Sequence, residues 1–236
     1  MAIPTIAALD RRFYSDYIDE HARFDVCIRR HLRPGMDVLD AGAGRGIRYP
    51  YDYGRIASRV AGVDVDPAVL DNVNLTDAAV ADLAALPYPN DAFDLVFSKY
   101  VFEHLEYPLP VLRELRRVMR LGAHLLVHTP NRWHYVALSA RITPLRFHVW
   151  FNERRGRVEA DTFPTCYRVN DVRSIPRLAA RSGFQVADLE QIETKPDYLA
   201  FHPIPYLAGI AYERLVNRSE RFGCIRVQLI VDLRAV

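Results

Sequence analysis

The chain has 236 residues, half of them hydrophobic and a quarter charged, which suits a globular protein with one large core and excludes a disordered chain. Its formal net charge of +2 gives no overall field that would favour nucleic acid or a membrane surface, and no apolar run approaches the ~18 residues of a membrane-spanning helix. The N-terminus lacks a signal-peptide pattern and the three cysteines lie far apart, so we expect a cytoplasmic protein with neither a disulfide framework nor a metal centre.

The first half of the chain predicts one helix followed by four strands. Apolar residues keep roughly helical spacing from Phe13 to His31, and Pro34-Gly35 then interrupts the pattern. Short apolar runs further along indicate buried strands, and the last of them is followed by an expected loop at Ser98 and Lys99. The expected strands are Met36–Asp40, Arg59–Val63, Thr76–Val80 and Phe93–Phe97.

The second half continues this alternation after one interruption. Apolar residues on one face predict a helix at Leu109–Met119, with Gly122 just after its last turn, and Ala123–Val127 predicts a fifth strand. Between Thr129 and Arg168 the alternation lapses, and arginine, aromatic and proline residues become frequent. It then resumes as helix, strand, helix and strand at Asn170–Ser182, Gln185–Leu189, Tyr206–Val216 and Ile225–Leu233.

Strands that alternate with helices predict an α/β fold, in which a mainly parallel, doubly wound sheet is covered by helices on both faces. We expect residues 1–236 to form a single domain. Residues 129–168 then form an insertion after the fifth strand, which is expected to lie as a lid over one end of the sheet.

A glycine-rich segment follows the first expected strand, with Gly42, Gly44 and Gly46. In open α/β sheets, ligands bind outside the carboxyl ends of the strands, and glycines there let the backbone approach a ligand closely. The spacing differs from the G-x-G-x-x-G pattern of dinucleotide sites, because Gly46 comes one position early and Ile47 takes the required place. The Gly-Lys-Ser/Thr end of a phosphate-binding P-loop is also missing. These departures favour a ligand without phosphate groups.

Three carboxylates follow three successive strands. Asp40 directly precedes the glycines, Asp64 ends the second strand, and Asp82 ends the third. A carboxylate beside the glycines would repel a pyrophosphate but attracts a cationic ligand such as S-adenosylmethionine, which carries an ammonium and a sulfonium. Asp64 is placed to accept both ribose hydroxyls, and Asp82 the adenine amino group. Each of these three aspartates alone is explained by an ordinary turn or helix cap, so the prediction depends on all three carboxylates occurring together.

Over residues 33 to 130 the motifs resemble those of the class I S-adenosylmethionine-dependent methyltransferases, most of all the type 11 small-molecule branch. The matching segments are Val38–Gly46, Gly62–Pro67, Asp82–Leu83, Leu86–Val96, Phe102–Leu105 and Arg113–Gly122. The resemblance implies a seven-stranded Rossmann-like sheet with a reversed last hairpin, and S-adenosylmethionine as the methyl donor. It implies that the cofactor is bound by Asp40, Ala41, Gly42, Gly44, Asp64, Val65, Asp82, Leu83, Ser98 and Lys99.

Two residues depart from the family pattern. Pro50 interrupts the helix that should follow the glycine loop, so this helix is expected to be short or displaced. Arg45 stands where a small residue is common, and no role is assigned to it.

Methyl transfer is an in-line displacement at a carbon activated by positive sulfur, so the protein has to align the reactants and exclude water. A hydroxyl acceptor also calls for a base. His104, a few residues after the fourth strand, is the first candidate, although packing under the lid or a cofactor contact explains it equally well. His128 and His134, at and just beyond the end of the fifth strand, are the other candidates.

The arginine and aromatic residues of 129–168 suggest the class of acceptor. Arginine forks suit phosphate or carboxylate and aromatic faces suit sugars, so we expect O-methylation of a sugar-containing or other hydroxyl or carboxyl metabolite. A solvated basic face with aromatic residues in the core explains the composition equally well. The chain has no appended RNA-binding module and lysine is rare, so nucleic acid is not expected, whereas a peripheral membrane contact for a lipid-linked acceptor stays open.

Two other functions compete with methyl transfer. An NAD-dependent oxidoreductase is disfavoured by the glycine spacing. A non-catalytic protein that binds S-adenosylmethionine and has kept the fold is the second alternative, because a fold does not fix a function.

Overall fold

The computed structural model of the chain describes residues 4–47, 51–142 and 164–236. Contacts divide the chain into two compact units. Unit 1 consists of residues 1–23, 131–163 and 191–228, and unit 2 of residues 24–130, 164–190 and 229–236. Most of the sheet and the glycine-rich segment belong to unit 2. Much of the predicted insertion, residues 143–163, lies outside the described residues.

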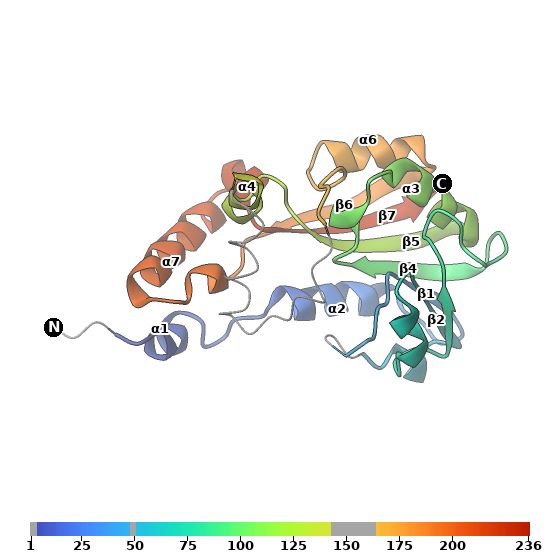
Figure 1. The fold of residues 1–236 in the computed structure, drawn as a ribbon, viewed down its shortest axis with the longest axis horizontal. Coiled ribbons are helices and arrows are strands. Elements are labelled where there is room, and N and C mark those ends of the chain that lie inside the picture. Colours follow the sequence, from blue (N-terminus) through green and yellow to red (C-terminus); the bar gives the residue numbers. More distant parts are fainter. Residues whose placement is uncertain (1–3, 48–50, 143–163) are drawn as a thin grey trace. The chain divides into compact units, whose positions relative to one another are not determined.

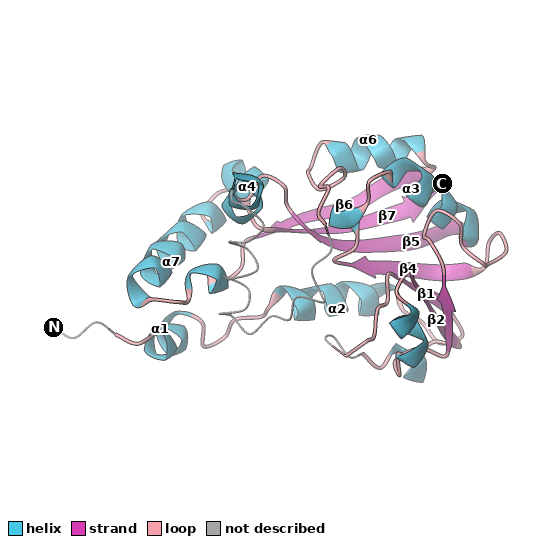
Figure 2. Ribbon diagram, viewed as in Figure 1, coloured by secondary structure: helices cyan, strands magenta, loops and turns pink. Residues whose placement is uncertain are grey.

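Seven strands form one sheet in the order β3-β2-β1-β4-β5-β7-β6, which Figures 1 and 2 show as a twisted set of arrows. The pairs β1–β2, β1–β4, β2–β3 and β4–β5 are parallel. The strands are β1 (Asp37–Ala41), β2 (Arg59–Asp64), β3 (Asp77–Val80), β4 (Phe93–Lys99), β5 (Met119–Pro130), β6 (Phe184–Ile192) and β7 (Gln228–Ala235).

The last hairpin reverses the direction of the sheet. The arrow of β7 points the opposite way from that of β4 (Figure 2). At the end of β7 the amide of Val236 donates to the carbonyl of Gly183, just before β6 begins. The predicted seven-stranded, mainly parallel sheet with an antiparallel last hairpin is therefore confirmed.

The central strands are buried on both faces because helices of unit 2 cover the sheet from two sides. In β1, Val38, Leu39 and Ala41 are fully buried, and the same holds for most of β4. Helices α3 (Pro108–Val118) and α6 (Ser174–Arg181) lie on one side of the sheet, and α2 (Glu20–His31) lies on the other (Figure 1). Such burial on both faces explains the continuous apolar runs from which the strands are predicted.

The predicted helix at Phe13–His31 is wrong in its first part. The chain forms two helices there, α1 (Ile6–Phe13) and α2, separated by residues 14–19. The side chain of Asp19 accepts a hydrogen bond from the amide of Ala22 at 2.7 Å, which caps the start of α2. A capping aspartate in the middle of an apolar pattern was the signal for this break.

Two further predictions about element ends are corrected. Gly122 does not end a helix, because α3 already stops at Val118 and Gly122 lies within β5 with a φ of +81°. Ser98 and Lys99 are not a loop but the last two residues of β4, where they pair with Val127 and His128 of β5. At Ser98 and Lys99 the neighbouring parallel strand β5 extends the pairing beyond the apolar run, whereas Gly122 lies where the register between β4 and β5 shifts.

The connections after β1 and β2 are shorter than helices. Between β1 and β2, the described residues contain one helical segment, the 3-10 turn η1 (Tyr53–Arg55), in keeping with the expected effect of Pro50 on this helix. After β2 the chain forms the 3-10 turn η2 (Pro67–Asp71), capped by Asp66. In their described residues, both connections are therefore formed by short 3-10 turns in place of α-helices.

The described residues of unit 1 are mostly helical. Besides the start of α2, they form α1, α4 (Tyr135–Ile142), η5 (Asp197–Leu199), α7 (Pro203–Asn217) and η6 (Glu220–Ile225). Leu9 of α1 packs against Tyr206 and Ile210 of α7, and the Tyr206 hydroxyl donates to the carboxylate of Asp10. None of the helices within the described ranges is both long and apolar enough to span a bilayer.

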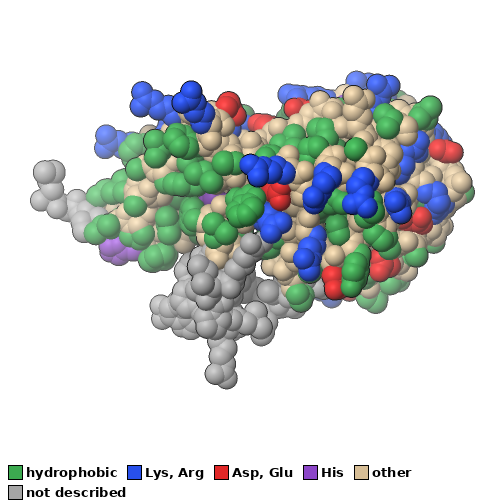
Figure 3. Space-filling view, turned by 90° about the horizontal axis from the view of Figure 1, so that it is seen from above, with side chains coloured by type: hydrophobic (Ala, Val, Ile, Leu, Met, Phe, Trp, Pro, Cys, Tyr) green, Lys and Arg blue, Asp and Glu red, His purple; other side chains and the backbone are tan. Residues whose placement is uncertain are grey.

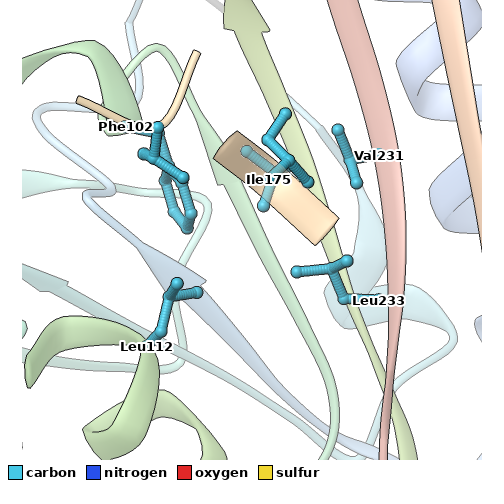
Figure 4. A pocket seen from close by; sticks show the side chains of 7 residues that line it. Phe102, Leu112, Ile175, Val231 and Leu233 are labelled. Carbon is cyan, nitrogen blue, oxygen red and sulfur yellow. The ribbon is translucent and has the colours of Figure 1, made fainter. Parts of the chain in front are cut away.

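A small cavity lies inside unit 2, among apolar side chains (Figure 4). Its lining residues are Phe102, Leu112, Val127, Val169, Ile175, Val231 and Leu233. None of these side chains carries a charge or a hydrogen-bonding group, so the cavity is a gap in core packing and not a site for a polar ligand.

Candidate cofactor site

The glycine-rich segment forms a tight loop at the carboxyl end of β1. The amides of Gly42 and Ala43 both donate to the carbonyl of Val63 in β2, at 2.8 and 3.0 Å. Gly42 has a φ of +87°, and a Cβ atom there would lie 2.2 Å from a methyl group of Val101. Only glycine satisfies both conditions without strain. The loop therefore brings bare backbone to the strand ends, as a close ligand contact requires.

Asp64, the last residue of β2, ties this loop in place. One of its carboxylate oxygens accepts from the amide of Gly44 at 2.9 Å, and the other accepts from the amide of Asp66 at 2.9 Å. Each carboxylate oxygen has a second lone pair, so both remain able to accept from the hydroxyls of a ribose. Val65, the next residue, is 62% exposed and offers an apolar surface beside them.

Asp40 is a buried carboxylate beneath the glycine loop. It is 5% exposed, and the hydroxyl of Tyr51 donates to it at 2.6 Å. Burial raises the pKa of Asp40 to about 7, and the charge of Asp64 adds to this rise. The hydrogen bond from Tyr51 and the positive charge of Lys99 act in the opposite direction. A second cation placed here would stabilise the ionised form, which fits the ammonium of S-adenosylmethionine.

The other predicted contacts divide between ligand-facing and structural positions. The Ser98 hydroxyl is fully buried and donates to the carbonyl of Ala41 at 2.7 Å, so this side chain joins β4 to β1. Leu83 is buried in the core, and only its backbone is left for a ligand. Asp82 is exposed two residues beyond β3, and its carboxylate accepts from the amide of Ala84 at 2.8 Å. Lys99, half-buried, ends β4.

Two asparagines that sequence reasoning missed support the glycine loop from below. The side-chain amide of Asn72 donates to the carbonyls of Ala43 and Gly44, at 3.1 Å each. Asn74 donates to the carbonyl of Gly46 at 2.9 Å. Their position just after η2 carries no motif, and the pairing spans 28 residues or more of chain, so no local pattern announces it.

His104 lies in the 3-10 turn η3 (Phe102–His104), after β4. Its Nδ1 atom lies 2.8 Å from the carbonyl oxygen of Pro164. A carbonyl can only accept, so Nδ1 carries the proton and the neutral ring presents Nε2 as its basic nitrogen. Nε2 lies 3.9 Å from a carboxylate oxygen of Glu103. The side chain is 29% exposed, so a substrate can reach it.

Glu103, which sequence reasoning did not select, is a second buried acid beside His104. Burial raises the pKa of Glu103 to about 7, partly offset by hydrogen bonds from its own backbone and from Thr129. Thr129 donates to Glu103 at 3.0 Å and accepts from the side-chain amide of Asn170 at 2.5 Å. The backbone of Glu103 also accepts from the amides of Cys166 and Tyr167. These bonds join η3 to the two ends of the predicted insertion, at Thr129 and at Cys166 and Tyr167.

The two other candidate bases are buried in different surroundings. His128 is fully buried at the end of β5, and its ring contacts those of Phe24 and Tyr100 at centroid distances of 5.3 and 4.7 Å. His134 belongs to unit 1, where its Nε2 atom lies 3.5 Å from a carboxylate oxygen of the buried Glu193. Of the three histidines, His104 combines solvent access with a defined basic nitrogen.

Part of the chain is similar in sequence to known proteins. Residues 39–127 match the family model described as "Methyltransferase domain", of type 11. A protein of Mycolicibacterium smegmatis named a probable S-adenosylmethionine-dependent methyltransferase is 38% identical over 134 residues, which are 53% of this chain and 51% of that protein. A tRNA U34 carboxymethyltransferase of Hahella chejuensis is 34% identical over 131 residues, which are 50% of this chain and 40% of that protein.

Solved structures share the fold over most of the chain. The S-adenosylmethionine-dependent methyltransferase of Mesorhizobium loti has a TM-score of 0.57 with 20% identity and covers 89% of this chain and 96% of its own. The geranyl diphosphate C-methyltransferase of Streptomyces coelicolor has a TM-score of 0.56 with 17% identity, over 98% of this chain and 82% of its own.

The chain spans about half the length of the curated relatives that it matches. The family match covers β1, β2, β3, β4 and most of β5, the strands that surround the glycine loop and its carboxylates. Over residues 39–127 the chain therefore matches the type 11 methyltransferase domain, and it is similar to class I S-adenosylmethionine-dependent methyltransferases.

Proposed function

We propose that the chain is an enzyme that methylates a small molecule at oxygen, with S-adenosylmethionine as the methyl donor. The observation that carries this proposal is the set of carboxylates at or just beyond the ends of β1, β2 and β3, of which Asp64 binds the amide of Gly44 in the glycine loop. Asp40, Asp64 and Asp82 supply negative charge where a dinucleotide site would have to receive phosphates.

The three carboxylates match the three polar parts of the cofactor. Asp40, buried and with the Tyr51 hydroxyl at 2.6 Å, is the partner for the ammonium group. Asp64 keeps a lone pair on each oxygen for the ribose hydroxyls. Asp82 is exposed beyond β3 and is the partner for the adenine amino group, with Val65 beside Asp64 providing apolar contact.

When bound, the cofactor supplies a methyl carbon made reactive by its positive sulfur. The residues of the chain then have two tasks, to orient the acceptor and to take up its proton. His104, with Nδ1 held by the carbonyl of Pro164, takes the proton of an acceptor hydroxyl at Nε2. Glu103, 3.9 Å from Nε2, stabilises the imidazolium that results.

A small-molecule acceptor is supported by the near-neutral balance of the chain and by its composition. The net charge of +2 provides little of the field that RNA binding needs. Arginine and aromatic residues between positions 129 and 168 suit an acceptor with a sugar, phosphate or carboxylate part. The acceptor oxygen is therefore a sugar hydroxyl or a carboxylate in this proposal.

An RNA acceptor is the second candidate, because several relatives are named tRNA U34 carboxymethyltransferases. Arginine side chains also gather over α3 and α6 on one face of unit 2, as Figure 3 shows in blue. The exposed ones are Arg113, Arg173, Arg177 and Arg181. Such a face would suit a phosphate backbone.

Calorimetric titration tests the cofactor assignment. S-adenosylhomocysteine should bind, and Asp64→Asn should weaken binding roughly tenfold or more, since a hydrogen bond to a charged group is worth about 1.5–3 kcal/mol. Asp66→Asn is the matched control, because its carboxylate caps η2 through the amide of Ala68 and belongs to no predicted contact. Saturation by NAD in place of S-adenosylhomocysteine would overturn the proposal.

Transfer of a labelled methyl group from S-adenosylmethionine to a fractionated cell extract tests the reaction. Label in the small-molecule fraction supports the proposal, and label in RNA favours the second candidate. Cofactor binding without any transfer would favour a non-catalytic protein. The test for methyl transfer is needed because a solved structure with the same fold, SpnF, is named a cyclase.

A further inference from the structure

Two histidines and an aspartate meet on one face of the sheet in unit 2. His31 is the last residue of α2, His124 lies in β5 and Asp232 lies in β7. His31 Nε2 is 3.0 Å from one carboxylate oxygen of Asp232, and His124 Nδ1 is 2.6 Å from the other. The two imidazole rings stack with their centroids 4.0 Å apart and 29° between their planes. No part of the proposed methyl transfer uses these side chains.

The three side chains are arranged as metal ligands are. One ligand atom from each lies within 4.8 Å of the other two, so a single ion can touch all three after small side-chain movements. Side-chain exposures of 29%, 24% and 15% leave a path from solvent. Each residue also comes from a different element of the sheet face, which restrains the set once the chain is folded.

The charges of the cluster favour a cation. Two imidazoles share one carboxylate, so the cluster offers two nitrogen donors and one anionic oxygen donor. Neutral imidazole is the form that binds a metal.

We propose that His31, His124 and Asp232 bind one divalent transition-metal ion of the zinc class. Imidazole nitrogens suit Zn²⁺, Co²⁺ and Ni²⁺, and two histidines with one carboxylate leave a coordination position for water. Calcium and magnesium are disfavoured, because both prefer sets made of oxygen atoms.

The metal site lies apart from the candidate cofactor site along the strands of unit 2. His124 pairs with Leu95, whereas His128 pairs with Lys99 at the carboxyl end of β4. His124 and His128 are four residues apart along the strand, which is about 13 Å at ~3.3 Å per residue. The ion therefore joins α2 to β5 and β7, and its expected effect is on stability.

Titration of chelator-treated protein with Co²⁺ and Zn²⁺ tests the site. The full chain should bind one equivalent of Co²⁺ with visible absorption bands of low-symmetry coordination, and Zn²⁺ should displace it and raise the melting temperature. Asp232→Asn and His31→Gln should each weaken binding at least about tenfold, because each removes a direct ligand. His202→Asn is the matched control, since it removes a histidine from unit 1 and keeps a side chain that caps α7.

Three results would overturn the site. Wild-type protein without cobalt bands would show that the three side chains form only a hydrogen-bonded triad. Equal Co²⁺ affinity in the wild type, Asp232→Asn and His31→Gln would show binding elsewhere. Loss of binding in His202→Asn alone would move the site to unit 1. Circular dichroism before metal addition identifies any variant that fails to fold. If a variant does not fold, the cobalt absorption of the wild-type protein still tests the site.

Discussion

The hydroxyl of Tyr51 donates a 2.6 Å hydrogen bond to Asp40, the buried acid at the end of β1. The Tyr51 ring stacks on that of Tyr53, with centroids 4.5 Å apart and 14° between the planes, and meets Phe97 edge-on at 5.5 Å. Aromatic rings thus lie around the Asp40 carboxylate, and the hydroxyl of Tyr51 supplies its hydrogen bond. The result is an acid with a pKa of about 7, held where a cationic ligand is expected.

The buried carboxyl of Asp40 should make the folded protein less stable as pH rises above the acidic range. Its pKa is raised from 3.8 to about 7 in the folded chain, so the folded state binds more protons than the unfolded state between these values, and stability falls as pH rises through them. Asp40→Asn removes this loss, and the ceiling on its gain at pH 8 is roughly 4 kcal/mol. Urea unfolding of both proteins from pH 4 to pH 8 measures the difference, which should grow with pH. A difference independent of pH would contradict the assignment.

Cofactor affinity should rise with pH in the same range. The ammonium of the ligand favours ionised Asp40, so binding improves as pH increases through about 7, by no more than tenfold per pH unit. Tyr51→Phe removes a hydrogen bond that lowers the pKa of Asp40, so it should move the midpoint to higher pH. Calorimetry with S-adenosylhomocysteine between pH 5.5 and pH 8 measures both. An identical pH profile for Asp40→Asn would rule out this role.

Gly42→Ala should be much more damaging than Gly35→Ala. Both glycines have similar φ values, +87° and +83°. Either substitution therefore places an alanine in the left-handed backbone region, which costs roughly 1 kcal/mol. A Cβ atom at position 42 would lie 2.2 Å from Val101, whereas nothing lies within 4 Å at position 35. We expect an additional loss of about 1–3 kcal/mol at position 42, from overpacking. Chemical denaturation of the two variants measures it, and equal losses would mean that Val101 moves aside freely.

Asn72→Ala should loosen the glycine loop and weaken cofactor binding. The substitution leaves the carbonyls of Ala43 and Gly44 without their side-chain donor, and one lost partner for a buried group costs about 1–3 kcal/mol. Asn217→Ala is a control of the same chemistry, because it removes an exposed hydrogen bond to Glu213 on α7. Stability and S-adenosylhomocysteine affinity are the readouts. Full affinity in Asn72→Ala would show that the loop holds its shape without this support.

His104→Gln should lower turnover and leave cofactor affinity almost unchanged. Glutamine can still donate to the carbonyl of Pro164 but has no basic nitrogen. No side chain at that position can then take up the proton of the substrate hydroxyl. General base catalysis is typically worth 10²- to 10⁴-fold, and the loss of turnover should fall near that range. Parallel measurements of kcat and of cofactor Kd separate the two effects. A fall in affinity without a fall in kcat would assign His104 to cofactor contact.

The strands and the carboxylates at their ends followed from the sequence alone. Strands buried on both faces leave continuous apolar runs, and the carboxyl ends of parallel strands meet at one edge of a sheet. These two rules are local in sequence, so they predict Asp40, Asp64 and Asp82 at the same edge of the sheet as the glycines without coordinates. The same locality explains the errors at Phe13–His31 and Gly122, where a cap and a neighbouring strand decided the ends of elements.

Pairings between side chains on distant elements were decided only by the tertiary structure. Asn72 reaches back 29 residues to the glycine loop, and His124 meets Asp232 across 108 residues. Tyr51 reaches Asp40 from a connection that contains no regular helix in its described part. Periodicity reports which face of an element is buried, but not which polar group on another element lies opposite. The sequence therefore predicted where a ligand is expected to bind, and the packing of the sheet determined how the carboxylates there are held and charged.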